Sequence, residues 1–144
     1  RLVPLQDELR FIRSYVELQR LQLGAHTVLD YREEGQAPDN ARIAPMILLL
    51  FVENCFKHYN SRGAGEKLIQ IHFEITEGWL EACIRNSFKP HARNEGTVDG
   101  QKAKSGIGLS AAIENLELVY GGRYRLEVDK SPPYYTINLK IPVL

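Results

Sequence analysis

The sequence lacks the cysteine content, the net charge and the long apolar runs that mark several classes of protein. Its 144 residues include two cysteines, one methionine and one tryptophan, and 18 basic and 18 acidic residues leave no net charge. That balance does not support direct binding to nucleic acid or to an anionic membrane surface through bulk charge. No apolar run approaches the roughly 20 residues that cross a bilayer, and no signal peptide is found.

What is present suits one globular domain. The length is that of a single domain, and 44% of the residues are hydrophobic. Cys55 and Cys83 lie in apolar segments, so we interpret both as reduced core residues of a cytosolic domain. The sequence starts inside a helical pattern, and we therefore expect it to be a piece of a longer protein.

Hydrophobic periodicity and turn residues divide the chain into helices and strands. Helical spacing of apolar residues predicts helices over 5–23, 45–58 and 106–120. Alternation and turn boundaries predict strands over 26–34, 67–75, 79–86, 123–129 and 134–143. A polar loop of about 19 residues, 87–105, precedes the third helix, and loops of that length are usually functional or disordered. This order predicts a two-layer α/β sandwich with helices on one face of a mixed sheet.

The helix over 45–58 carries the first chemical signal, because it is apolar on most sides until it becomes polar at Glu53 and Asn54. Asn54 shares a helix face with Lys57 and His58, which follow three and four residues later. An amide oxygen suits Mg²⁺, Lys57 offers a point charge to phosphate, and Glu53 could orient or deprotonate a nucleophile. The alternative is a helix end turning into solvent, with Lys57 and His58 complementing the helix dipole.

Two further signals lie on either side of the long loop. At its end, the glycines of Ser105-Gly106-Ile107-Gly108-Leu109 would let backbone N–H groups approach a phosphate where a helix begins. Before it, Ile84-Arg85-Asn86-Ser87 ends a strand with a short polar side chain that could read a base edge. Each has a structural alternative, since such glycines often make a plain loop-to-helix turn and polar residues often end strands.

In combination, these segments resemble the GHKL ATPase superfamily and, within it, the LytS-like sensor histidine kinases. The stretch PMILLLFVENCFKH (45–58) resembles their N box, KSGIGLSAAIENLELVYGG (104–122) their G2 region, and LQDELRFIRSYVELQRLQLG (5–24) the helix before their catalytic domain. The resemblance covers essentially the whole chain. It implies a histidine kinase ATPase fold of the Bergerat type, with residues 1–24 ending a dimerisation and phosphoacceptor-region helix and residues 25–144 forming the ATP-binding catalytic domain.

The resemblance also implies ligands and site residues. Asn54 would coordinate Mg²⁺, Glu53 would be a candidate base or water-orienting group, and Lys57 and His58 would face the phosphates of ATP. Asn86 stands at the adenine-reading position. The rest of the nucleotide-binding set, at the end of an ATP lid over 87–105, would be Lys104, Ser105, Gly106, Gly108 and Leu109, with the two glycines lining the triphosphate.

Three departures from the family pattern are visible. The adenine-reading position is commonly Asp followed by Asn or Gly, and here it is Asn86-Ser87. Asn115-Leu116 replaces the usual Arg-Leu pair after the G2 glycines. The acceptor-histidine helix has no counterpart in the sequence, because no matching context surrounds any of the four histidines, His26, His58, His72 and His91.

The implied function is to bind Mg·ATP and present its γ-phosphate to a histidine on another segment of the same full-length protein. That protein would be a homodimer and a membrane-bound sensor, with this domain in the cytoplasm and a response regulator as partner. Two alternatives stay open: a non-catalytic nucleotide-sensing or dimerisation module, and an ATP hydrolase of the gyrase or chaperone kind. The sequence has no transducer domain such as those hydrolases use.

Overall fold

The structure, a computed structural model, describes residues 1–59, 66–88 and 99–144, except for the side chains of residues 99–108. The described elements are, in chain order, β1 (Val3–Pro4), α1 (Leu5–Arg20), β2 (Thr27–Glu34), β3 (Arg42–Ile43), α2 (Ile47–His58), β4 (Lys67–Thr76), β5 (Trp79–Ser87), α3 (Asp99–Tyr120), β6 (Arg125–Asp129) and β7 (Tyr134–Pro142). No helix in this part of the chain combines the length and the apolar character needed to span a membrane.

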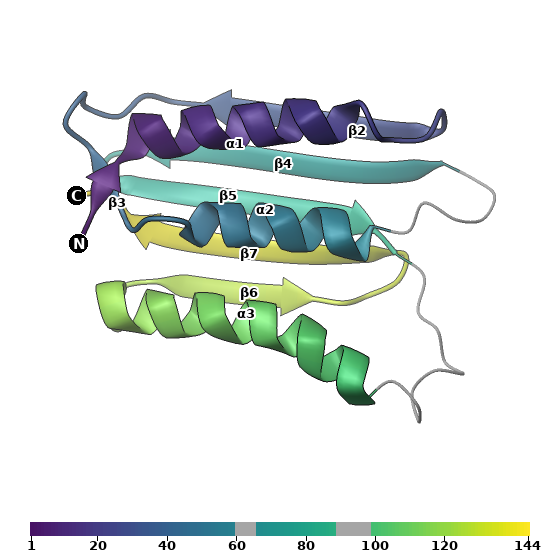
Figure 1. The fold of residues 1–144 in the computed structure, drawn as a ribbon. Coiled ribbons are helices and arrows are strands. Elements are labelled where there is room, and N and C mark those ends of the chain that lie inside the picture. Colours follow the sequence, from purple (N-terminus) through teal and green to yellow (C-terminus); the bar gives the residue numbers. More distant parts are fainter. Residues whose placement is uncertain (60–65, 89–98) are drawn as a thin grey trace.

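Five strands form one mixed sheet in the order β2-β4-β5-β7-β6 (Figure 1). β2 and β4 run parallel, and the other neighbouring strands run antiparallel. Parallel neighbours need a crossover connection, and α2 lies in the one between β2 and β4. The three helices lie over the same face of the sheet (Figure 1). The predicted two-layer α/β sandwich with a mixed sheet is therefore confirmed.

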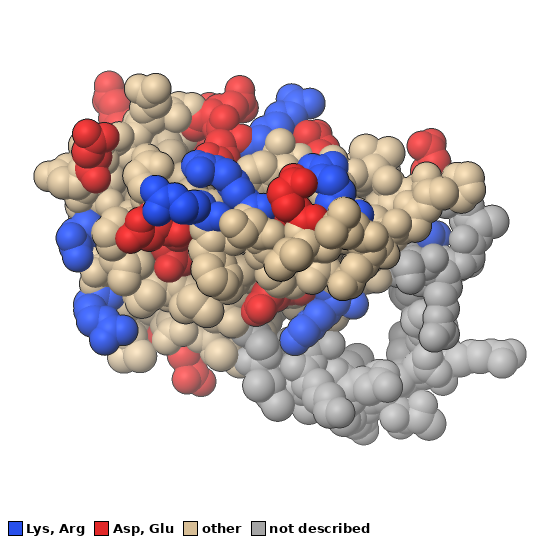
Figure 2. All heavy atoms as spheres, turned by 45° about the horizontal axis from the view of Figure 1, so that its top comes forward, with Lys and Arg blue, Asp and Glu red and all other residues tan. Residues whose placement is uncertain are grey.

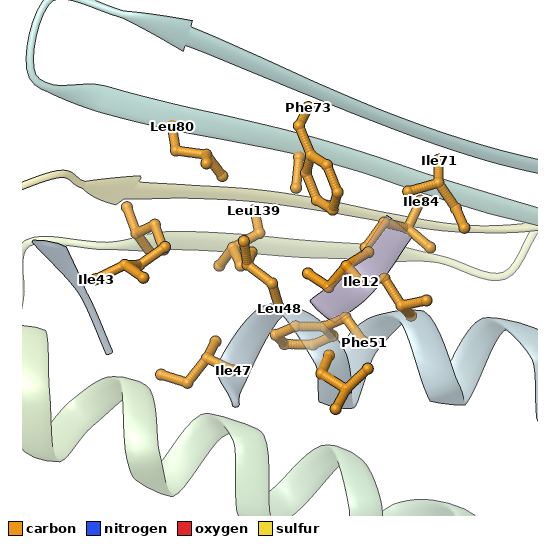
Figure 3. Packing of buried hydrophobic residues seen from close by; sticks show 14 of the residues in the cluster. Ile12, Ile43, Ile47, Leu48, Phe51, Ile71, Phe73, Leu80, Ile84 and Leu139 are labelled. Carbon is orange, nitrogen blue, oxygen red and sulfur yellow. The ribbon is translucent and has the colours of Figure 1, made fainter. Parts of the chain in front are cut away.

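The apolar core lies between the helix layer and this face of the sheet, and side chains from both layers meet there (Figure 3). In β4, Ile69, Ile71 and Phe73 are buried, and the residues between them point to the opposite face, as strand geometry requires. α2 places Phe51 against the same core (Figure 3). Full burial of one such side chain contributes about 1.5–3 kcal/mol.

α1 belongs to this core. Its inward residues, each at most 2% exposed, are Leu5, Leu9, Ile12 and Val16. Arg13 fastens the helix to β2 by donating hydrogen bonds from Nε and Nη2 to the carboxylate of Glu33, at 2.7 and 2.8 Å. The role of residues 1–24 as the end of a dimerisation helix stays a prediction, and any such contact would have to use the outward side of α1.

The start of α2 is held by both other helices. Met46, which precedes the helix, has a left-handed backbone with a φ of 68°. Its N–H donates to the carboxylate of Glu8 in α1 at 3.2 Å, and the N–H of Ala44 donates to the hydroxyl of Tyr120 in α3 at 2.9 Å. These contacts fix the position from which α2 runs toward its polar C-terminal end.

The start of α3 differs from the sequence-based expectation. A loop is predicted over 87–105, whereas α3 begins at Asp99, so the prediction is wrong for residues 99–105. Gly106 and Gly108 consequently lie inside the helix and not at its first turn. The residues Gln101, Lys102, Ala103 and Lys104 have high helix propensity, and the helix continues through the interior glycines although each costs about 1 kcal/mol relative to alanine. The rest of the predicted loop, 89–98, lies outside the described residues.

Candidate functional site

The polar residues at the end of α2 face two directions. The His58 ring stacks on Tyr135 of β7, with ring centroids 5.2 Å apart and planes inclined by 9°. Asn54, one turn earlier, also lies beside Tyr135. Glu53 instead lies toward α1, where its charge adds to burial, the larger cause, in raising the pKa of Tyr15. Asn54 and His58 therefore share the side of α2 that faces the sheet at β7.

Asn86 lies on β5 directly opposite Tyr135 and is only 1% exposed. Its side-chain Nδ2 donates to the carbonyl oxygen of Ser87 at 3.0 Å. The thiol of Cys55 in α2 lies 3.7 Å from the carbonyl oxygen of Arg85, which keeps the end of α2 over this part of β5. The predicted helix-end and strand-end residues are thus brought together around one aromatic ring.

Two buried amide atoms at this place, Asn86 Oδ1 and Asn54 Nδ2, make no hydrogen bond of ordinary geometry among the described residues, although Asn54 lies close enough to the Tyr135 hydroxyl to oppose the rise in its pKa that burial causes. Buried polar atoms are nearly always paired, and an unpaired one costs about 1–3 kcal/mol. A rotation of 180° exchanges the nitrogen and oxygen of an amide, so Asn54 can present either atom at its unpaired position. Two such atoms beside one ring make this place the candidate site for a polar ligand.

Three members of the cluster are missed by the sequence analysis: Phe88, Lys130 and Tyr135. The Phe88 ring meets Tyr135 edge-on, with centroids 6.1 Å apart, and Lys130 Nζ lies 5.8 Å from the centroid of the Tyr135 ring. Alternation along 134–143 could have placed Tyr135 on the buried face. Its position opposite Asn86 depends on the register of β5 against β7, which the pattern does not give.

His58 is held in its neutral form at pH 7. Burial against Tyr135 lowers the pKa of the imidazole, and the positive charges of Lys130 and Lys57 lower that pKa further. Two lysines on different elements thus surround a half-buried, uncharged ring. Both lysine charges therefore act on this ring.

The remaining predicted residues lie in α3, which packs beside α2 (Figure 1). Leu109 is partly buried against the core. The side chains of the others lie outside the description, and these residues are Lys104, Ser105, Gly106 and Gly108. Their assignment to the nucleotide stays a prediction.

The described residues bring together no group of three or more His, Cys, Asp or Glu side chains able to hold a metal. A metal ion at this place would take a protein ligand from an amide such as that of Asn54, and its other ligands from water and phosphate. Mg²⁺ is commonly bound by few protein oxygens together with waters and substrate phosphates. The residues present therefore fit Mg²⁺ brought in with a phosphate ligand.

The fold is that of the catalytic domains of histidine kinases. The catalytic domain of histidine kinase ThkA has a TM-score of 0.62 and 15% identity, with 99% of this chain and 94% of that chain covered. Full-length ShkA in complex with AMPPNP gives 0.65 and 16%, covering 99% of this chain and 31% of that one. ThkA in complex with the response regulator protein TrrA gives 0.58 and 16%, covering 100% and 42%.

By sequence, the chain is similar to the sensor protein LytS of Staphylococcus epidermidis, with 23% identity over 145 residues and 97% of this chain covered. The chain spans 24% of the length of that relative. A comparison with protein-family models finds no match. The resemblance to LytS-like sensor histidine kinases that the sequence motifs predict is confirmed by this relative together with the shared fold.

Proposed function

We propose that this chain is the ATP-binding catalytic domain of a two-component sensor histidine kinase, which binds Mg·ATP for phosphoryl transfer to a histidine outside this sequence. The observation that carries the proposal is that two buried amide atoms without an ordinary hydrogen bond, Asn54 Nδ2 and Asn86 Oδ1, lie beside Tyr135. A neighbour with the same fold, ShkA, is in complex with AMPPNP, an analogue of ATP.

At the base end, Asn86 would read the adenine. One N–H of its Nδ2 donates to Ser87, and the atom without a partner is the acceptor Oδ1. The exocyclic amino group of adenine is a donor and matches it, whereas the carbonyl at the same position of guanine is an acceptor and opposes it. The buried position strengthens this preference, because a mismatched polar pair there has no water to replace it.

At the phosphate end, Asn54 would hold the metal through its amide oxygen, and Lys57 would add a positive charge. Bound Mg²⁺ neutralises charge on the phosphate oxygens. Glu53, the carboxylate of this helix end, lies on the α1 side of α2 and would orient the incoming nucleophile from there. The segment Lys104, Ser105, Gly106, Gly108 and Leu109 would complete the site from α3. Phosphoryl transfer depends on positioning and charge stabilisation more than on covalent chemistry by the protein.

The partners belong to the same proposal. The γ-phosphate would pass to a phosphoacceptor histidine elsewhere in the full-length protein, a homodimer, and then to a response regulator. Support comes from ThkA, which shares the fold and is in complex with the response regulator TrrA. The similarity to a sensor protein supports a membrane-bound sensor with this domain on the cytoplasmic side.

Calorimetric titration with AMPPNP, with and without Mg²⁺, tests the proposal. The parent should bind more tightly with Mg²⁺, Asn54→Ala should lose at least tenfold and with it the Mg²⁺ dependence, and Asn86→Ala should lose about tenfold with or without Mg²⁺. Asn138→Ala, on the solvent-facing side of β7, is the matched control and should bind as the parent does. No binding by the parent, or equal affinity in all four proteins, would contradict the proposal.

A second measurement separates kinase from the alternatives. Transfer of labelled phosphate to an added acceptor segment supports the kinase assignment. Steady hydrolysis of ATP without transfer supports a GHKL-type hydrolase, and binding without either reaction supports a nucleotide-sensing module.

A further inference from the structure

The turn between β6 and β7 holds one side of the candidate site. It lies at the same end of the sheet as the C-terminal end of α2 (Figure 1). The N–H of Phe88, two residues after Asn86, donates to the carbonyl oxygen of Pro133 at 2.8 Å. Within the turn, the backbone N–H and the hydroxyl of Ser131 donate to Oδ1 of Asp129 at 2.9 and 2.6 Å. The turn is therefore fastened to the strand end that carries Asn86.

Lys130 extends from this turn over the aromatic cluster. Its Nζ lies 5.8 Å from the centroid of the Tyr135 ring, close to the outer limit of about 6 Å for a cation–π contact. Burial is the main cause of the lowered pKa of His58, and among the charges that add to it Lys130 acts more strongly than Lys57, the neighbour of His58 in the sequence. The ammonium group therefore lies near both stacked rings.

This ammonium group keeps N–H donors for a ligand. A lysine ammonium has three donors and no acceptor, and none of the carboxylates that the structure describes forms an ion pair with Lys130. Basic and acidic side chains are interspersed on the face of the molecule that carries α1 (Figure 2), and the chain has no net charge. Recognition of a ligand therefore depends on individual side chains at the site and not on a field of one sign.

Asn86 and Lys130 offer opposite hydrogen-bonding groups from neighbouring positions. The acceptor Oδ1 of Asn86 lacks a partner, and Asn86 lies directly opposite Tyr135, the residue over whose ring Lys130 lies. A ligand that satisfies both residues must present a donor next to an acceptor. Adenine has such edges, because the ring nitrogens N1 and N7, which are both acceptors, flank its exocyclic amino group.

We propose that Lys130 is a specificity-determining residue, which donates a hydrogen bond to a ring nitrogen of adenine beside the amino group that Asn86 reads. The inference rests on the proposed function, because it requires the base to lie against Asn86. Asn86 by itself reads the amino group alone. With Lys130, the site reads a donor and a neighbouring acceptor on the same base.

Replacement of single ring nitrogens by carbon tests this contact. Calorimetry compares ATP, 1-deaza-ATP and 7-deaza-ATP, all with Mg²⁺, on the parent and on Lys130→Met, which keeps a side chain of similar length without charge. In the parent, one of the two analogues should bind about tenfold more weakly than ATP. Lys130→Met should bind ATP about tenfold more weakly than the parent does. The variant should bind that analogue and ATP equally, because both changes remove the same hydrogen bond.

Lys140→Met is the matched control. Lys140 also lies over an aromatic ring, with Nζ 5.0 Å from the centroid of Trp79, but it is exposed on the sheet face opposite the helices. This variant should bind all three nucleotides as the parent does. An equal loss in Lys140→Met and Lys130→Met would overturn the proposal, because the loss would then not come from a contact at the site.

Adenosine separates a contact with the base from a contact with phosphate. Lys130→Met should weaken the binding of adenosine by the same factor as that of ATP, and a loss confined to ATP would overturn the proposal. An analogue that Lys130→Met discriminates from ATP as strongly as the parent does would overturn it as well. A parent that does not bind ATP overturns the proposed function and this inference with it. A parent that binds ATP, together with a Lys130→Met variant of equal affinity, overturns this inference alone.

Discussion

Asn86 carries both a donor and an acceptor, and its neighbour decides which of them a ligand meets. From the sequence, a free amide could rotate to suit adenine or guanine. In the folded chain, one N–H of Nδ2 donates to the carbonyl oxygen of Ser87 at 3.0 Å, and Oδ1 is the atom left without a partner. The atom that this environment leaves for a ligand is thus a hydrogen-bond acceptor.

A free acceptor at Asn86 predicts selectivity for the base. The parent should bind ATP at least tenfold more tightly than GTP, because one buried mismatch costs about 1–3 kcal/mol. Asn86→Ala should bring the ratio of the two affinities close to one by weakening ATP binding alone. Competition between ATP and GTP for the parent and the variant measures the ratio. A ratio unchanged by the substitution would show that Asn86 does not read the base.

Gly35 is a second residue whose identity the fold demands. It follows β2 with a φ of +85°, and a Cβ on it would stand 2.0 Å from the carbonyl oxygen of Ile75 at the end of β4. Gly35→Ala should therefore lower the free energy of unfolding by roughly 2–4 kcal/mol, through a backbone clash that no rotamer change relieves. Urea denaturation measures the loss.

Gly78 provides the matched control for that measurement. Its φ is +80°, but nothing lies within 4 Å of an added Cβ. Gly78→Ala should cost only the left-handed strain, about 1–2 kcal/mol. Equal losses at the two positions would mean that the close approach of Gly35 to Ile75 carries no energy.

At the scale of elements, the attachment of α1 to β2 depends on one carboxylate. Burial alone raises the pKa of Glu33, but hydrogen bonds from Arg13 and Tyr31 and the charge of Arg13 outweigh it, and the pKa is lowered from its ordinary value of 4.5. A carboxyl group with a lowered pKa stabilises the folded state above its unfolded-state pKa, and this stability is lost as the pH falls through the folded-state value.

Glu33→Gln should accordingly reduce the free energy of unfolding at pH 7 by about 1 kcal/mol, a modest figure because Arg13 is half exposed. The difference between parent and variant should shrink below pH 4.5, where the parent also becomes protonated. Chemical denaturation at pH 7 and at lower pH measures it. Glu34→Gln, one residue further on the opposite face of β2, is the control, and a difference that does not change with pH would contradict the assignment.

α3 shows where element prediction from local pattern falls short. Glycines at 100, 106 and 108 look like loop residues, yet the helix begins at Asp99. Helix formation is cooperative, so favourable residues on both sides extend a helix across unfavourable ones. The N-terminal end of α3 is therefore set by the summed preference of the segment and not by individual glycines.

At the scale of the whole molecule, the domain holds a candidate nucleotide site, and two of the histidines that the structure describes already have partners. His58 is stacked on Tyr135, and His72 Nε2 lies 3.1 Å from Asp30 on the outer sheet face. We predict that the chain alone, incubated with γ-labelled ATP, forms no acid-labile, base-stable phosphohistidine. Acid and base treatment of the labelled protein distinguishes the outcomes. Label with that stability would show that one of its own histidines accepts phosphate.

The sequence by itself determined the elements and the fold class, because strand alternation and helical spacing are local patterns that each segment's own residues contain. Outside α3, the pattern predicts seven larger elements, and six of them agree with the structure to within two residues at each end. The exception is α1, which ends at Arg20, whereas the pattern predicts an end at residue 23. Asn54, His58 and Asn86 were also recognisable, since a polar residue at the end of an apolar helix or strand stands out in the sequence.

Only the tertiary structure decided how these residues meet. Tyr135 comes opposite Asn86 through the register of β5 and β7, His58 stacks on it through the placement of α2 over the sheet, and Lys130 reaches it from the turn before β7. Each of these contacts joins residues from different elements. Their geometry follows from the packing of two layers, which no local pattern contains.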